Sequence, residues 1–293
     1  MRIGALEAGG TKMVCALGDE EGKIYEKISI PTQTPQITIP RMLEFFKERE
    51  IEAMGIGCFG PIDLNRESET YGYITTTPKL AWRNFDMVGT FQKALHVPVG
   101  FDTDVNGSAL GEATWGITRG LENSVYITVG TGIGMGIITN GKVLHGMLHP
   151  EAGHIILKQH PNDPYEGKCP YHKTCLEGLA AGPAIEERWG KKGNELSEKK
   201  EVWELEAYYI GQALVNLILI LSPQRIVLGG GVMHQEQVLT LVRQEVEKQL
   251  NGYVKTKELE RMEEYIVLPS LNDNQGIMGA IRMALNEKER VEG

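Results

Sequence analysis

The chain has 293 residues, which is more than one hydrophobic core usually supports, so two domains are expected. Its composition, 41% apolar and 24% charged, is that of an ordinary globular enzyme. The net charge of −9 argues against a nucleic-acid or anionic-membrane partner, because the long-range field would repel both.

The chain shows no feature of an exported or membrane-inserted protein. Its start, MRIGALEAGG, lacks a basic segment followed by an apolar one. The most apolar run, from Leu214 to Leu221, contains Asn216 and is too short to span a bilayer. We therefore expect a cytoplasmic protein, whose four cysteines are reduced or bind metal.

The first 120 residues alternate between strands and helices. Strands are predicted at 2–7, 13–17, 23–30, 53–59 and 98–101. Helices are predicted at 38–49, 86–95 and 104–114, the second with Asp86 as its N-cap.

The same opening, a strand, a glycine turn and another strand, recurs at residue 124. The remaining strands are predicted at 124–129, 137–139, 142–144, 225–228 and 265–268. Helices are predicted at 198–221, 235–250 and 275–285, followed by a frayed polar end. This recurrence indicates an internal duplication in an α/β fold. We expect domains at 1–120 and 121–293, with the C-terminal helix as a candidate to complete the first.

Two glycine turns, one in each half, are candidates for phosphate binding. In the first, Gly9 and Gly10 leave the backbone bare while Thr11 and Lys12 add donors for a phosphate. An ordinary hairpin turn is the alternative. The second is predicted as a turn over residues 130–136, with glycine at every second position, so that one face of the backbone is open to a ligand.

A third glycine run lies between a predicted strand and a predicted helix. It consists of Gly229, Gly230 and Gly231. A bare backbone at a helix start suits the ribose or phosphates of a nucleotide, and a plain strand-to-helix turn is the alternative.

Asp104 is the candidate general base. It lies where a predicted strand ends and a helix begins, so its carboxylate could accept a hydroxyl proton during phosphoryl transfer. The alternative is that Asp104 is only a helix N-cap.

One loop carries candidate metal ligands: His154, Cys169, His172 and Cys175. Imidazoles and thiolates at such spacings favour tetrahedral Zn²⁺, and four protein ligands would make the zinc structural. The alternative is a loop with two stray thiols.

Two acids flank this loop. Glu151 and Glu177 could accept hydrogen bonds from sugar hydroxyls, the alternative being solvated surface acids.

Several segments together resemble the ROK family of sugar kinases and sugar-responsive repressors. They are 7–12 (EAGGTK), 104–112 (DVNGSALGE), 130–134 (GTGIG), 151–154 (EAGH) and the Cys/His loop, in this order. Within the family, residues 76–82 (TTPKLAW) resemble the bacterial fructokinase branch.

The resemblance implies two actin-like domains of the RNase H-like, hexokinase type, with ATP and sugar between them. By position, Asp104 matches the general base, and the zinc-binding loop covers 151–177. The residues that match the nucleotide side are Gly9, Gly10, Thr11, Lys12, Thr131, Gly132, Gly182, Pro183, Gly229, Gly230 and Gly231. Those that match the sugar side are Thr103, Asp104, Glu151, His154 and Glu177, with His154 also the zinc-bound histidine of the family.

Two departures from the family's pattern bear on ligands. The usual C-x-C-x₄-C loop is replaced here, so that His172 stands for the middle thiolate. Glucose-specific members usually carry Asn just before the catalytic Asp, whereas this chain has Thr103. The expected reaction is therefore phosphorylation of fructose to fructose 6-phosphate by ATP·Mg²⁺, with a glucokinase or mannokinase as alternatives.

Two other classes of protein are alternatives to a sugar kinase. A sugar-responsive repressor would have a DNA-binding segment before the first phosphate loop, which here begins at residue 7. An actin-like ATPase would not need the sugar-contacting acids or the metal loop. A homodimer is expected.

Overall fold

The computed structural model describes all of residues 1–293 and separates into two compact units. Unit 1 comprises residues 1–120, 143–149 and 270–293, and unit 2 comprises residues 121–142 and 150–269. Each unit is built on one five-stranded sheet.

The sheet of unit 1 has the order β3-β2-β1-β4-β7. Its strands are β1 (Ile3–Ala8), β2 (Lys12–Gly18), β3 (Ile24–Pro31), β4 (Ala53–Cys58) and β7 (Val99–Thr103). Strand β2 is antiparallel to β1 and β3, whereas β1, β4 and β7 are parallel. A separate ribbon pairs β5 (Tyr73–Ile74) with β6 (Phe85–Asp86).

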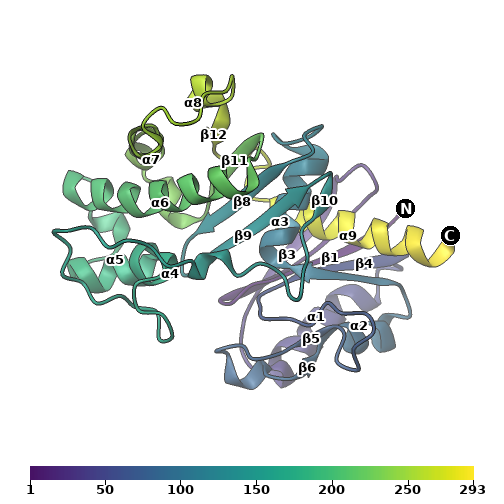
Figure 1. Cartoon of the computed structure of the whole chain (residues 1–293). Coiled ribbons are helices and arrows are strands. Elements are labelled where there is room, and N and C mark those ends of the chain that lie inside the picture. Colours follow the sequence, from purple (N-terminus) through teal and green to yellow (C-terminus); the bar gives the residue numbers. More distant parts are fainter. The chain divides into compact units, whose positions relative to one another are not determined.

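Helices cover both faces of this sheet, which is why its central strands are mostly apolar. Alternate residues of β1 point to opposite faces: Ile3 packs with Ile277 in one core cluster, and Leu6 packs with Phe46 and Phe91 in the other. The helices are α1 (Pro35–Lys47), α2 (Met87–Leu95), α3 (Asp104–Trp115) and α9 (Gln275–Glu292). In Figure 1, α1 and α2 lie on one side of the unit 1 sheet and α9 on the other.

The sheet of unit 2 repeats this topology with the order β10-β9-β8-β11-β12. Its strands are β8 (Ser124–Val129), β9 (Ile133–Thr139), β10 (Lys142–Val143), β11 (Arg225–Gly229) and β12 (Ile266–Val267). Strand β8 is antiparallel to β9 and parallel to β11, which in turn is parallel to β12. The duplication and the α/β class predicted from the sequence are therefore confirmed.

Unit 2 is completed by helices around this sheet (Figure 1). The α-helices are α4 (Leu176–Ala180), α5 (Gly182–Trp189), α6 (Lys200–Leu221), α7 (Glu236–Leu250) and α8 (Met262–Tyr265). Single 3₁₀ turns in the chain are Leu80–Trp82, Ala152–His154, Gly193–Glu195, Gly231–His234 and Leu259–Arg261.

Helix α6 is the one helix whose length and composition would allow it to cross a membrane. Half of its most apolar window is buried, and Trp203, Tyr209 and Leu214 have no exposed surface. The helix packs against α7 and α4, so its apolar residues are those of a core helix.

The structure corrects three predicted boundaries. Strand β9 begins at Ile133, so Gly134 and Gly136 pair with β8 and the second glycine turn covers only residues 130–132. Helix α1 begins three residues earlier than predicted, with Pro35 in its first turn, where a missing N–H costs nothing.

The third correction concerns the C-terminus. Helix α9 continues to Glu292 instead of fraying after residue 285. Glu287 is buried and pairs with Arg66 at 2.6 Å and with Arg290 at 2.7 Å. These ion pairs stabilise the last turns, which a polar composition alone did not indicate.

Candidate active-site and metal-binding residues

The first glycine turn joins β1 to β2 and is held by backbone and hydroxyl groups. The Gly9 N–H donates to the Lys12 carbonyl at 3.0 Å, and the Thr32 hydroxyl donates to the Gly9 carbonyl at 2.8 Å. The side chains of Thr11 and Lys12 are exposed. The Thr11 hydroxyl and the Lys12 ammonium are therefore not used to hold the turn together.

A second cation lies beside this turn. A β-carbon placed on Gly10 would lie 3.0 Å from Cε of Lys79, so the end of this side chain lies directly against the turn. The Lys79 ammonium is 5.9 Å from the centre of the Phe59 ring. No role beyond its place in the fructokinase-like segment was predicted for Lys79, because its contact with residue 10 depends on the fold.

Asp104 is the first residue of α3, and the helix is capped by its neighbour. Thr103 is the N-cap, and its hydroxyl accepts from the Asn106 N–H at 3.1 Å. Asp104 instead accepts from the Val105 N–H at 2.9 Å. The alternative that Asp104 serves as the N-cap is therefore wrong.

Asp104 and Glu7 form a pair of carboxyl groups with perturbed acidity. Burial raises the pKa of Asp104 to about 6. Burial, and then the charge of Asp104, raise the pKa of Glu7 to about 7. Near neutral pH Asp104 is thus ionised yet more basic than an ordinary aspartate, which is the property required of a general base. The sequence placed Glu7 at the start of the first glycine segment, but its electrostatic link to Asp104 depends on the fold.

A buried aspartate two residues before Asp104 is paired with a partly exposed histidine. Asp102 is 6% exposed, and its Oδ2 lies 2.8 Å from Nε2 of His145. The amide of Asn106 donates to the other carboxylate oxygen at 2.7 Å, and the hydrogen bond with Asp102 raises the pKa of His145. The sequence did not indicate this pair, because 43 residues separate its members and no motif links them.

The segment around His145 is fixed to unit 1 at a second point. The ring of His149 accepts from the Ile62 N–H at 3.2 Å. The chain enters unit 2 directly after this anchor, at Pro150.

In unit 2 the structure brings together three glycine segments that the sequence assigned to the nucleotide. The Gly182 N–H donates to the Gly130 carbonyl at 2.7 Å, and the Gly130 N–H donates to Gly132 at 2.9 Å. A β-carbon on Gly130 would lie 3.9 Å from the nitrogen of Gly231. The second turn, the start of α5 with Pro183, and the end of β11 therefore form one bare backbone surface.

The third glycine run differs in one respect from its predicted form. A single 3₁₀ turn, Gly231–His234, separates it from α7, which begins at Glu236. Gly230 has a φ of 90°, a conformation that strongly favours glycine. The run therefore presents the N–H groups of a short turn and not those of a long helix.

The four predicted metal ligands converge in unit 2. The donor atoms of His154, Cys169, His172 and Cys175 all lie within 4.8 Å of one another. Nδ1 of His154 is 3.7 Å from the Cys169 sulfur and 3.5 Å from the Cys175 sulfur, and Nδ1 of His172 is 3.7 Å from the Cys169 sulfur. Tetrahedral zinc with two nitrogen and two sulfur ligands requires separations of about 3.3–3.8 Å. The donor set therefore fits Zn²⁺.

The two acids that flank the metal cluster have different surroundings. Glu151 is exposed beside the 3₁₀ turn that carries His154. Glu177, in the first turn of α4, accepts from the Ile133 N–H at 2.9 Å, and its other oxygen lies 3.9 Å from Nε2 of His154. Glu177 is thus not a solvated surface acid.

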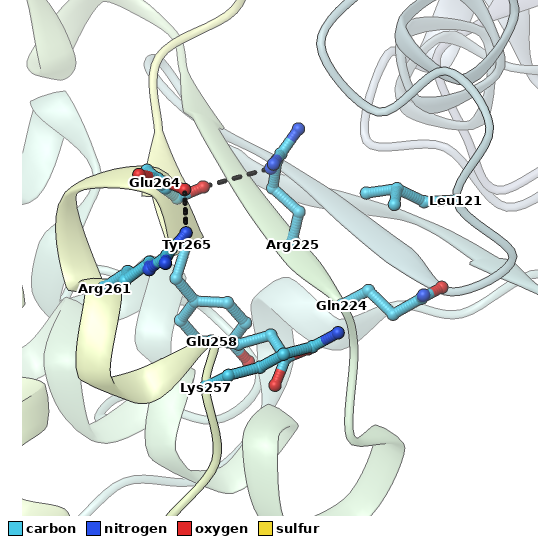
Figure 2. Close-up of a pocket in the computed structure, with 8 residues that line it drawn as sticks. All are labelled: Leu121, Gln224, Arg225, Lys257, Glu258, Arg261, Glu264 and Tyr265. Carbon is cyan, nitrogen blue, oxygen red and sulfur yellow. Dashed lines mark hydrogen bonds and ion pairs between the residues drawn. The ribbon is translucent and has the colours of Figure 1, made fainter.

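A cavity of about 310 Å³ lies elsewhere in unit 2, at the start of β11 (Figure 2). The glycine segments follow the opposite ends of β8 and β11. The two arginines that line the cavity already have partners: Arg225 donates to the Glu264 carbonyl at 3.0 Å, and Arg261 lies 3.7 Å from the Glu264 carboxylate. The cavity is therefore separate from the candidate site.

Comparison with known proteins identifies the family of the chain. Residues 3–287 match the model of the ROK family. The chain is 51% identical to a putative fructokinase of Bacillus subtilis, over 96% of this chain and 95% of that protein. It is 44% identical to a fructokinase of Pediococcus pentosaceus, over 97% and 98% of the two chains.

Solved structures give the same result for the fold. A ROK hexokinase from Thermus thermophilus superposes with a TM-score of 0.80 at 27% identity, covering 99% of this chain and 100% of that one. The predicted hexokinase-type fold is therefore confirmed, and the chain belongs to the ROK family of proteins.

Proposed function

We propose that this protein is an ATP-dependent hexose kinase that converts fructose to fructose 6-phosphate. The assignment of fructose as the substrate rests on a difference in sequence identity. Proteins named fructokinase are 44–51% identical to the chain, whereas those named glucokinase are 26–30% identical. The site geometry supports direct phosphoryl transfer.

Asp104 is assigned as the general base. Its carboxylate takes the proton of the sugar C6 hydroxyl, whose oxygen bonds to the γ-phosphorus as the bond from that phosphorus to the β,γ-bridging oxygen breaks, leaving ADP. The raised pKa of about 6 supports this role, since Asp104 is both ionised and basic near pH 7.

Phosphate binding is assigned to the two glycine turns and nearby cations. In unit 1, Thr11, Lys12 and Lys79 offer a hydroxyl and two ammonium groups beside bare backbone. In unit 2, the backbone around Gly130 and Gly182 has no side chain that would block a nucleotide. Mg²⁺ accompanying ATP would neutralise phosphate charge and be held largely by the phosphates themselves.

Thr103 is assigned a part in sugar choice. Its hydroxyl oxygen accepts from the helix backbone, so the hydroxyl proton remains free to donate to a sugar oxygen. Asn at this position, usual in glucose-specific members of the family, would present an amide with two donor hydrogens instead. A sugar that leaves buried polar groups unpaired loses about 1–3 kcal/mol per group.

The metal cluster is assigned a structural Zn²⁺, because all four coordination positions come from the protein. The sugar-side residues Glu151 and Glu177 belong to the same loop region. We further place the protein in the cytoplasm, where ATP is available, and the expected homodimer stays a prediction that light scattering would test.

The test is a coupled ADP-release assay with fructose, mannose and glucose at identical ATP·Mg²⁺. We expect kcat/KM to be highest for fructose, second for mannose, and about ten- to a hundred-fold lower for glucose than for fructose. Glucose equal to or better than fructose would overturn the fructose assignment. ADP release that is independent of sugar would overturn the kinase assignment.

A further inference from the structure

The carboxylate of Glu177 is shared between the metal cluster and the second glycine turn. One oxygen accepts from the Ile133 N–H at 2.9 Å, and the other faces Nε2 of His154 at 3.9 Å. The opposite ring nitrogen of His154 points at the two cysteine sulfurs. A carboxylate behind a ligating histidine commonly fixes the orientation of its ring.

Two glycines show how closely the metal loop and the second glycine turn are packed. A β-carbon on Gly132 would lie 2.7 Å from the Glu177 carboxylate oxygen. A β-carbon on Gly153, next to His154, would lie 1.8 Å from the Ile133 carbonyl oxygen. Both the N–H and the carbonyl of Ile133 are therefore in contact with residues of the metal loop.

The metal ligand Cys175 also sets the position of Glu177. Cys175 is the N-cap of α4, and its sulfur accepts from the Gly178 N–H at 3.4 Å. The N–H of Leu176 donates to the Ile155 carbonyl at 3.0 Å, next to His154. A candidate metal ligand and the neighbour of another therefore hold the start of the short helix that carries Glu177.

We propose that Glu177 is a positioning residue that couples the metal cluster to the second glycine turn, so that nucleotide affinity depends on an ordered metal site. The inference rests on the proposed assignment of residues 130–132 to phosphate binding. Its physical basis is the Ile133 N–H: Ile133 is 5% exposed, and without the carboxylate this N–H loses a charge-assisted hydrogen bond in a place that water barely reaches.

The experiment compares Glu177→Gln, which keeps an acceptor oxygen, with Glu177→Ala, which removes it. Each variant is loaded with Zn²⁺ and its metal content is measured before use. The readouts are hydrogen exchange of the Ile133 amide and the Kd for Mg²⁺·AMP-PNP by calorimetry. Glu186→Ala, an exposed acid of neighbouring α5, is the matched control.

We expect Glu177→Ala to raise the Ile133 exchange rate and the AMP-PNP Kd by about tenfold each, and Glu177→Gln to stay within about threefold of the parent. Metal removal by a chelator should reproduce the Glu177→Ala result in the parent. Should Glu177→Ala not fold, Glu177→Asp, which keeps the charge but lacks the reach, replaces it with the same expectation.

The proposal is overturned when exchange at Ile133 and AMP-PNP affinity in the metal-loaded alanine variant equal those of the parent. It is equally overturned when metal removal leaves the AMP-PNP Kd unchanged. If the parent itself did not bind AMP-PNP, the proposed function would fail, while the exchange of Ile133 would still report the link between Glu177 and the turn.

Discussion

The two glycine turns occupy equivalent places in two copies of one topology, but they are held in different ways. The turn of unit 1 is fixed within its own sheet, by the Thr32 hydroxyl at the end of β3. The turn of unit 2 is fixed by Glu177, which belongs to an inserted loop with four metal ligands. The first turn therefore needs only its sheet, whereas the second depends on a loop that is itself ordered by side-chain chemistry.

Unit 1 also carries the proposed general base. Asp104 follows β7 and Glu7 lies near the end of β1, and both have raised pKa values because of burial. We therefore expect changes in unit 1 to affect proton transfer, whereas changes in the metal loop of unit 2 should affect the proposed nucleotide surface.

Loss of the base in unit 1 should have the largest effect. We expect Asp104→Asn to lower kcat by about 10²–10⁴ while Mg²⁺·AMP-PNP and fructose bind nearly as in the parent, since Asn keeps the size but cannot take a proton. Steady-state kinetics and calorimetry measure both. A kcat within a few-fold of the parent would show that Asp104 is not the base.

The parent enzyme offers a second check on the same residue. Because kcat/KM follows the ionised base, it should fall about tenfold per pH unit below pH 6. An acid limb near pH 4 would instead indicate an unperturbed aspartate.

Loss of the metal should affect unit 2 far more than unit 1. We expect about one Zn²⁺ per purified chain, and removal by a chelator should raise the fructose KM by about tenfold or more, because Glu151 and His154 lie in the loop. Elemental analysis and hydrogen exchange provide the measurement. Amides of α4 and β9 should exchange faster, whereas those of β1 and β4 should not.

The opposite outcome would be informative as well. Equal increases of exchange in both units would contradict the idea that the first turn is independent of the metal loop. Protein that had never met a chelator and yet contained no metal would contradict the zinc assignment.

Loss of the second cation of unit 1 should have a moderate effect. We expect Lys79→Met, which keeps the packing of the stem beside Gly10, to lower kcat/KM for ATP by about tenfold through the lost phosphate charge. Lys79→Arg should recover part of the loss. Lys93→Met in α2, far along the sequence from the glycine turn, provides a control with the same change of charge.

The sequence predicted the fold well where the signal is local. Apolar strands, glycine turns and the Asp86 N-cap are each indicated by a few neighbouring residues. All were found near their predicted places. The end of α9 was missed because its stability comes from Arg66, which lies far away in the chain and pairs with Glu287.

The same distinction between local signals and distant partners holds for the candidate site. The clustering of the four Cys and His side chains was predicted because Cys and His in one loop are rare without a function, and their spacing is visible in the sequence. The roles of Lys79 and the Asp102–His145 pair, and the link between Glu7 and Asp104, were missed, since each depends on a partner brought near by the fold. The second turn was predicted too long, because alternate glycines in a strand resemble a turn.

The last expected effect is on stability and not on activity: removal of the proposed base should stabilise unit 1. The folded-state pKa of Asp104 is about 6, against 3.8 for the ordinary group, so folding penalises its charge. For an acid with a raised pKa, this cost is fully present above pH 6 and disappears as the pH falls through 6 towards 4. Asp104→Asn should therefore be more stable than the parent by about 2 kcal/mol at pH 7, allowing for partial exposure of the side chain. The two proteins should converge near pH 4, and the ligand-free forms compared by urea unfolding at both pH values provide the measurement. Glu186→Gln, which removes an exposed charge, is the control and should change stability little at either pH. If the parent were as stable as Asp104→Asn at pH 7, the Asp104 carboxylate would not be desolvated.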